Sequence, residues 1–211
     1  MTRRVKICGM SDEASVRAAV AAGADYLGFI IFPKSPRAVS LADAARLSAF
    51  KGAAKSVAVL VDPDDSLLGQ VLRVLSPDII QLHGDESPQR CLDVRNYVGE
   101  GVWKAVPVSG AADVARASRY AGFVDAIVFD AKPPGGADRP GGWGQGYDYS
   151  LVKGFDALPF LLAGGLSPET VADAIAASGA QAVDTVSGVE AAPGVKDMKR
   201  MEAFIRAAKG A

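Results

Sequence analysis

The sequence is poor in the two residue types that most often build disulfide frameworks and zinc sites. It contains two cysteines, Cys8 and Cys91, and one histidine, His83, among 211 residues. Two cysteines are too few for a disulfide framework, so we expect both to be reduced thiols. A single histidine with no second ligand at metal-binding spacing speaks against a zinc site, and we predict no metal.

The chain also lacks long apolar runs, a strong net charge and low-complexity tracts. The longest apolar stretches, such as residues 26–32, are too short to span a bilayer, and the N-terminus has no charged-then-apolar signal pattern. The formal net charge is −1 with basic and acidic residues interspersed, which provides no electrostatic surface for nucleic acid or an anionic membrane. We therefore expect a cytoplasmic globular protein with no nucleic-acid and no membrane partner.

Short apolar segments alternate along the chain with segments of helical spacing. Such alternation is typical of a parallel sheet covered by helices, and eight units favour a (β/α)8 TIM barrel, a single domain over residues 1–211. An open doubly wound sheet is the alternative, but the first turn, Cys8-Gly9-Met10-Ser11, lacks the three-glycine spacing of a dinucleotide fold. The predicted strands cover residues 3–8, 25–31, 56–61, 78–82, 102–106, 125–130, 159–163 and 181–185. The predicted helices cover residues 12–22 after a Ser11 cap, 41–50, 64–75, 87–98, 111–121, 147–153, a segment opening at Ser167, and 197–208.

Cys8 and Asp130 stand at the carboxyl ends of the first and sixth predicted strands, the end where barrel enzymes carry their active sites. These strands lie on different sides of a barrel mouth, so one group could protonate a substrate while the other removes a proton. Near neutrality the thiol would need a lowered pKa and the carboxyl a raised one. Lys6, on the same side of its strand as Cys8, could supply positive charge. The alternatives are a small buried hydrophobe for Cys8 and a helix or loop cap for Asp130.

Other polar residues fall in the loops at the same end of the predicted barrel. Arg37 ends a proline-stiffened loop, where its guanidinium could grip a planar carboxylate bidentately or simply be a solvated surface cation. His83 follows the fourth strand, and both substrate contact and a structural imidazole are open to it. Asp184 ends the eighth strand. Residues 132–146 form a Gly- and Pro-rich loop without periodicity, and a loop of that length inside a compact domain is usually functional.

Glycine turns follow the last two strands, at residues 162–168 and 184–190. In such barrels the loops after strands seven and eight often hold a phosphate through backbone N–H groups, which glycine allows to approach closely. The alternative is a pair of ordinary left-handed turns, but two such turns at this location favour a phosphate site. The residues concerned are Gly164, Gly165, Ser187 and Gly188.

Seven short motifs occur in order along the whole chain. They are Lys6-Ile7-Cys8-Gly9, Phe32 with Ser35-Pro36-Arg37, Gln81-Leu82-His83-Gly84, Phe129-Asp130, Gly141-Gly142 with Gly144, Leu162-Ala163-Gly164-Gly165-Leu166, and Asp184 with Ser187-Gly188-Val189-Glu190. Together they resemble the phosphoribosylanthranilate isomerase family of tryptophan biosynthesis. The resemblance implies a cofactor-free Amadori rearrangement of N-(5-phosphoribosyl)anthranilate to 1-(2-carboxyphenylamino)-1-deoxyribulose 5-phosphate.

The resemblance also implies a role for each matching residue. Asp130 is expected to be the general acid that protonates the ribose ring oxygen and opens the ring to a Schiff base. Cys8 is expected to be the general base that takes the proton from C2. Arg37 would hold the anthranilate carboxylate, Asp184 would contact ribose hydroxyls, and His83 would belong to the substrate site. The phosphate would lie against backbone groups around Gly144, Gly164, Gly165, Ser187 and Gly188.

Two positions depart from the family pattern. Val186 stands where the family usually has the first of two serines, and Trp143 stands where its loop usually has a threonine. Each change removes a hydroxyl near the expected phosphate site, whereas binding through backbone N–H groups would survive both.

Other functions remain open at this point. The analogous isomerase of histidine biosynthesis and a ribulose-phosphate epimerase are the nearest enzymes, but a thiol on strand one and a single phosphate cradle favour the anthranilate substrate. A catalytically silent phosphate-binding barrel that serves as a partner protein is the alternative from another class, and the presence of both Cys8 and Asp130 speaks against it. We expect a small phosphorylated substrate as the partner, and a monomer or homodimer.

Overall fold

Eight parallel strands close into a barrel. Each strand pairs with the next in sequence, and β1 pairs with both β2 and β8, so that Ile7 has Leu27 on one side and Thr185 on the other. The computed structural model describes residues 3–98, 101–137 and 139–211. The predicted (β/α)8 barrel is confirmed, and the open sheet is excluded. The strands are β1 (Arg4–Cys8), β2 (Tyr26–Ile30), β3 (Lys55–Leu60), β4 (Ile79–Leu82), β5 (Val102–Val108), β6 (Ala126–Ala131), β7 (Phe160–Leu162) and β8 (Ala182–Thr185).

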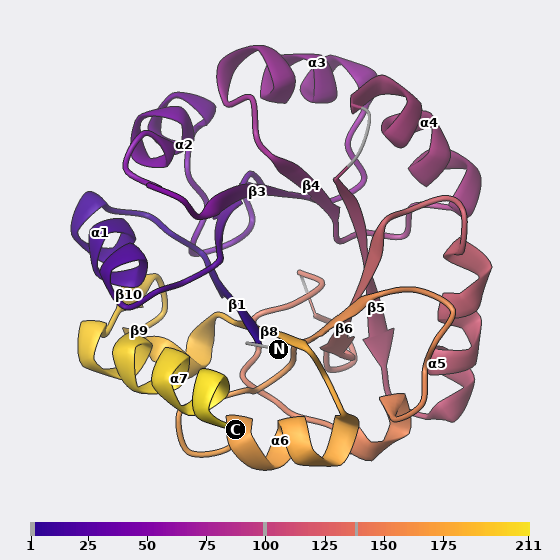
Figure 1. The fold of residues 1–211 in the computed structure, drawn as a ribbon. Coiled ribbons are helices and arrows are strands. Elements are labelled where there is room, and N and C mark those ends of the chain that lie inside the picture. The colour runs from indigo at the N-terminus through magenta and orange to yellow at the C-terminus, as the bar shows by residue number, and fades with distance from the viewer. Residues whose placement is uncertain (1–2, 99–100, 138) are drawn as a thin grey trace.

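The helices form a ring outside the barrel (Figure 1). Among the described residues an α-helix follows every strand except β6, after which the chain runs through a long loop to the 3₁₀ helix η2 (Tyr149–Val152), where we predicted a helix. No helix in the described ranges is long and apolar enough to cross a membrane. The α-helices are α1 (Glu13–Ala21), α2 (Leu41–Ser48), α3 (Asp65–Val74), α4 (Pro88–Val98), α5 (Ala111–Ala117), α6 (Val171–Ser178) and α7 (Met198–Gly210), and the other 3₁₀ helices are η1 (Ser118–Tyr120) and η3 (Ser187–Val189).

A small antiparallel hairpin lies between β8 and α7 and was absent from the prediction. It consists of β9 (Glu190–Ala192) and β10 (Val195–Lys196). Each strand is too short to show the alternation that marks a strand in sequence. The hairpin matters because it carries two charged residues of the site described below.

Strand side chains alternate between two apolar cores, as expected for strands that are covered on both faces. In β3, Val59 points into the barrel, whereas Leu60 packs with the surrounding helices. Near the amino ends of β2 and β5, Tyr26 and Trp103 meet edge to face with ring centroids 5.0 Å apart. This packing fills the floor of the barrel, so the space for a ligand lies at the opposite, carboxyl-end mouth.

Several helices start later than predicted, α1 and α6 among them. Asp12 rather than Ser11 caps α1, because the Asp12 Oδ1 accepts a hydrogen bond from the N–H of Ser15 at 2.8 Å. The helix expected to open at Ser167 is preceded by a turn, in which the Thr170 hydroxyl accepts the N–H of Ser167 at 3.0 Å, and α6 begins one residue after Thr170. At α1 the side chain that completes the cap hydrogen bond, rather than the first polar residue, marks where the helix begins.

Candidate active site

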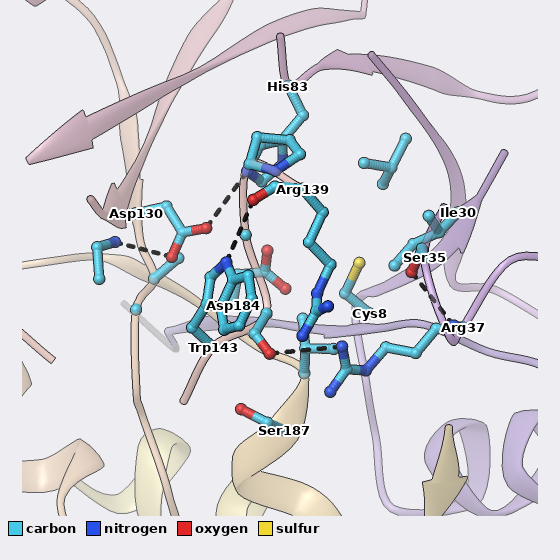
Figure 2. Close-up of a pocket in the computed structure, with 18 of the residues that line it drawn as sticks. Cys8, Ile30, Ser35, Arg37, His83, Asp130, Arg139, Trp143, Asp184 and Ser187 are labelled. Atoms are coloured by element: carbon cyan, nitrogen blue, oxygen red, sulfur yellow. Dashed lines mark hydrogen bonds and ion pairs between the residues drawn. The ribbon is translucent and has the colours of Figure 1, made fainter. Parts of the chain in front are cut away.

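A pocket opens at the carboxyl ends of the strands. All the predicted site residues except Gly188 line it, and Gly188 directly follows the lining residue Ser187. Figure 2 shows Cys8 and Asp130 on opposite sides of this pocket. Strands one and six therefore present the thiol and the carboxyl to the same space, as predicted. The apolar part of the wall is formed by Ile30, Phe32, Val59, Val61, Ala163, Leu166 and Val186, together with Trp143.

Cys8 ends β1 and is only 3% exposed. It is accommodated because its neighbour on β2 is Gly28, where a Cβ would lie 2.6 Å from the Cys8 Sγ. Burial raises the pKa of the Cys8 thiol above its ordinary value, and the nearby ammonium of Lys6 opposes that rise. The lowered pKa that we expected for catalysis is therefore not found, although its predicted source of positive charge, Lys6, is in place.

Lys6 and Asp184 form a buried ion pair beneath Cys8. They are register partners on β1 and β8, and the Lys6 Nζ lies 2.8 Å from the Asp184 Oδ2, with the two side chains 0% and 5% exposed. Burial opposes the charge on Lys6, but Asp184 and Cys8 outweigh it, so the pKa of Lys6 is raised and the ammonium persists. The other carboxylate oxygen, Asp184 Oδ1, is buried and has no hydrogen-bond partner among the described residues. An acceptor in that position suits a ligand hydroxyl.

Asp130 is held at the end of β6 by two neighbours. Its Oδ1 accepts the N–H of Ala131 at 2.9 Å, and its Oδ2 lies 3.3 Å from the His83 Nε2. The other ring nitrogen of His83 is 3.1 Å from the side-chain amide nitrogen of Gln81, which was not among the predicted site residues. His83 thus lines the pocket as predicted and also orients the carboxyl of Asp130.

Arg37 is buried, which excludes the alternative of a solvated surface cation. It is 4% exposed, and its Nε and Nη2 each donate to one oxygen of the Glu190 carboxylate at 2.8 Å. Lys196 lies 3.0 Å from the same carboxylate. Burial opposes the charge on Glu190, but the two cations outweigh it and hold the pKa of its carboxyl below the usual range. No role was predicted for Glu190 or Lys196, because nothing in their local sequence indicates that they pair with Arg37.

The glycine turns after β7 and β8 are packed too tightly for any other residue. Gly165 has φ +66°, and a Cβ there would lie 2.6 Å from the Gly146 nitrogen. Gly164 has φ +85°, and a Cβ at Gly188 would collide with the Leu166 carbonyl oxygen at 1.9 Å. The 3₁₀ helix η3 starts in the second turn, as expected of the short extra helix in such barrels. This backbone arrangement is suited to holding a phosphate.

The loop after β6 lies across the pocket mouth. A Cβ at Gly141 would lie 2.8 Å from the Asp130 Oδ2, and the Gly142 carbonyl accepts a hydrogen bond from the Arg37 Nη1 at 3.4 Å. Arg139, which the sequence analysis did not single out, also lines the pocket. In the described part of the chain, no group of three or more His, Cys, Asp or Glu side chains is arranged to hold a metal ion.

Comparison with known proteins gives one consistent result. The sequence profile of the N-(5'-phosphoribosyl)anthranilate (PRA) isomerase family matches residues 5–207. The chain is 47% identical over 213 residues to the N-(5'-phosphoribosyl)anthranilate isomerase of Rhizobium meliloti strain 1021, with 100% of this chain and 99% of that protein covered.

Two solved structures are similar over nearly the whole fold. One is phosphoribosyl anthranilate isomerase in complex with reduced 1-(o-carboxyphenylamino)-1-deoxyribulose 5-phosphate, at a TM-score of 0.86 and 35% identity, covering 99% of this chain and 100% of that one. The other contains monomers of the dimeric phosphoribosylanthranilate isomerase of Thermotoga maritima, at a TM-score of 0.85 and 36% identity, with the same coverage.

Proposed function

Because the chain belongs to the N-(5'-phosphoribosyl)anthranilate isomerase family, we propose that Asp130 and Cys8 carry out the two proton transfers of that family's reaction. The protein is an isomerase of tryptophan biosynthesis, which converts N-(5'-phosphoribosyl)anthranilate to 1-(2-carboxyphenylamino)-1-deoxyribulose 5-phosphate by an Amadori rearrangement. The observation that carries the assignment of roles is the placement of an acid and a thiol in one pocket, between a buried guanidinium and two glycine turns.

Ring opening is the task of Asp130. Its protonated carboxyl gives a proton to the ribose ring oxygen, the bond from C1 to that oxygen breaks, and the electron pair of the anthranilate nitrogen forms the C1=N bond of a Schiff base. Ala131 and His83 hold the two carboxyl oxygens, so the proton is presented in a fixed direction.

Cys8 then removes the proton from C2. The electrons of the C2–H bond form a C1=C2 double bond while the C=N electrons return to nitrogen, which gives an enolamine. The enolamine loses its hydroxyl proton at C2 and gains a proton at C1, leaving the ketone. The positive charge of Lys6, held in place by Asp184, favours the thiolate that this step requires.

The substrate's two anionic ends match the two ends of the pocket. Since Glu190 occupies the Nε and Nη2 edge of Arg37, the substrate carboxylate would meet Nη1, where the Gly142 carbonyl is a weak partner at 3.4 Å. The phosphate would lie in the glycine turns against backbone N–H groups of Gly144, Gly164, Gly165, Ser187 and Gly188. The unpartnered Asp184 Oδ1 would accept from a ribose hydroxyl.

We further propose a cytoplasmic protein that works without metal or cofactor, as a monomer or homodimer. Proton transfers by a thiol and a carboxyl need no redox group, and a relative of known structure is dimeric. Light scattering on the purified protein distinguishes the two assembly states. Addition of a chelator should leave turnover unchanged.

The direct test is an assay on freshly generated N-(5'-phosphoribosyl)anthranilate, following the loss of its fluorescence. The account predicts turnover by the purified protein with no added metal or cofactor. Tight binding of a phosphorylated ligand without turnover would instead identify the protein as a catalytically silent phosphate-binding barrel.

A further inference from the structure

One aromatic residue of the pocket has no part in the mechanism above. Trp143 lies in the loop after β6, between Gly142, whose carbonyl accepts from Arg37 at 3.4 Å, and Gly144, where a Cβ would lie 3.3 Å from the Ser187 Oγ. The backbone on either side of Trp143 therefore lies close to both ends of the proposed substrate site, the carboxylate end at Arg37 and the phosphate end at Ser187.

The indole of Trp143 is held at one edge and carries a guanidinium on one face. Its Nε1 donates to the carbonyl oxygen of Arg139 at 3.2 Å, and the guanidinium carbon of Arg139 lies 3.9 Å from the ring centroid. The side chain lines the pocket and is still 36% exposed. Figure 2 shows the Arg139 guanidinium between Trp143 and Cys8, inside the cavity. A flat, delocalised group thus already stacks on the indole within the pocket.

We propose that the indole of Trp143 is the surface on which the anthranilate ring of the substrate stacks, replacing the Arg139 guanidinium. The inference rests on the proposed function, because that substrate brings a planar aromatic ring into the pocket. The ring is bonded directly to the carboxylate that Arg37 would hold. Because the Gly142 carbonyl contacts Arg37, the ring must lie close to Gly142 and to the next residue, Trp143. A face that accepts a planar cation accepts an aromatic ring as well, and offset stacking adds to the burial of apolar surface.

The rest of the lining supports this choice. Phe32 and Trp143 are aromatic, whereas most of the other apolar lining residues, such as Ile30 and Val59, are aliphatic and offer no flat face. Of the two aromatic residues, Trp143 directly follows Gly142, whose carbonyl accepts from the Arg37 guanidinium.

The test compares Trp143→Ala and Trp143→Phe with the wild-type protein by calorimetry. The probes are reduced 1-(2-carboxyphenylamino)-1-deoxyribulose 5-phosphate, which carries the ring, and ribulose 5-phosphate, which lacks it. We expect Trp143→Ala to weaken binding of the ring-bearing probe by about tenfold, and Trp143→Phe to stay within about threefold of wild type because phenylalanine keeps a stacking face. Binding of ribulose 5-phosphate should be equal in all three proteins.

Two results would overturn the inference. In one, Trp143→Ala binds the ring-bearing probe as tightly as the wild type does. In the other, it loses affinity for both probes equally, which would mean that Trp143 only supports the loop. Turnover by the wild-type protein, measured on the same preparation, separates these failures from a failure of the proposed function: absent turnover would remove that function and this inference with it.

Discussion

Cys8 combines two properties that the sequence presented as alternatives. It is packed like a core residue, 3% exposed against Gly28, and it also lines the pocket opposite Asp130. Its burial raises its pKa, and a buried ammonium two residues earlier on the same strand counteracts the rise. The thiol is thus kept from solvent while it still faces the pocket in which the substrate would bind.

Arg37 should act in binding more than in the chemical step. Replacing it with alanine removes the proposed charge-assisted contact to the substrate carboxylate, so we expect KM to rise about 10- to 100-fold with a smaller change in kcat. Steady-state kinetics on N-(5'-phosphoribosyl)anthranilate measures both constants.

Arg37→Lys is the matched variant, because alanine also leaves Glu190 without one of its two cations. Lysine keeps the charge but has no guanidinium fork, so its KM should lie between those of wild type and alanine. An unchanged KM in Arg37→Ala would remove this residue from the carboxylate site.

The glycine turns and the loop over the mouth are elements in which backbone shape carries the function. Gly165→Ala puts a Cβ at a positive φ and 2.6 Å from a backbone nitrogen. We expect the free energy of unfolding to fall by about 1–3 kcal/mol and the affinity for inorganic phosphate to weaken. Urea unfolding and phosphate titration measure the two effects.

Gly135→Ala is the control, since it lies in the loop after β6 and a Cβ there meets nothing within 4 Å. It should match the wild type in both measurements. If the two alanine variants behaved alike, the tight packing of Gly165 would not be what shapes the phosphate site.

Helices and strands could be predicted where one hydrophobic pattern continues over several residues. They could not be predicted where contacts between distant residues determine the local structure. The apolar runs of β2 and β6 were found to within one residue at their ends, because strands covered on both faces have uninterrupted apolar sequence. The hairpin of β9 and β10 was missed, and with it the partners of Arg37. Glu190 is separated from Arg37 by 153 positions, and local sequence contains no sign of such a contact.

On the scale of the whole molecule, burial of Cys91 makes stability depend on pH. Cys91 packs α4 onto the barrel, and burial raises the pKa of its thiol from 9.0 to about 12. The unfolded chain ionises this thiol first, so its contribution to stability is complete below pH 9 and is lost as the pH rises toward 12. Between pH 8 and 10.5 the loss amounts to about 2 kcal/mol.

Urea unfolding of wild type and Cys91→Ala at both pH values measures this contribution. The variant should start less stable, because of the cavity, but should lose about 2 kcal/mol less over the pH interval. Equal losses in the two proteins would show that Cys91 does not titrate as its burial requires.

The barrel as a whole could be predicted from the number and order of its elements. Eight apolar strands that alternate strictly with helices leave few possible arrangements of a parallel sheet, and a closed barrel is one of them. The position of the pocket followed from the same rule, since strand ends meet at one mouth. What sequence could not provide was the interior chemistry, namely the Lys6 and Asp184 pair, the second hydrogen bond of His83 to Gln81, and the position of Trp143. The ion pair joins residues that are 178 positions apart in the chain. Trp143 lies in a loop without periodicity, and the contact of Gln81 with His83 is local but depends on how the two side chains turn.

The central claim is that Cys8 and Asp130 are the base and the acid of the isomerisation. Its most direct test measures turnover of N-(5'-phosphoribosyl)anthranilate by Cys8→Ala and Asp130→Asn, alongside their binding of the reduced product analogue. We predict that turnover by each variant falls by about 10²- to 10⁴-fold, while its Kd for the analogue stays within about threefold of wild type. Near-native turnover by either variant would contradict the account.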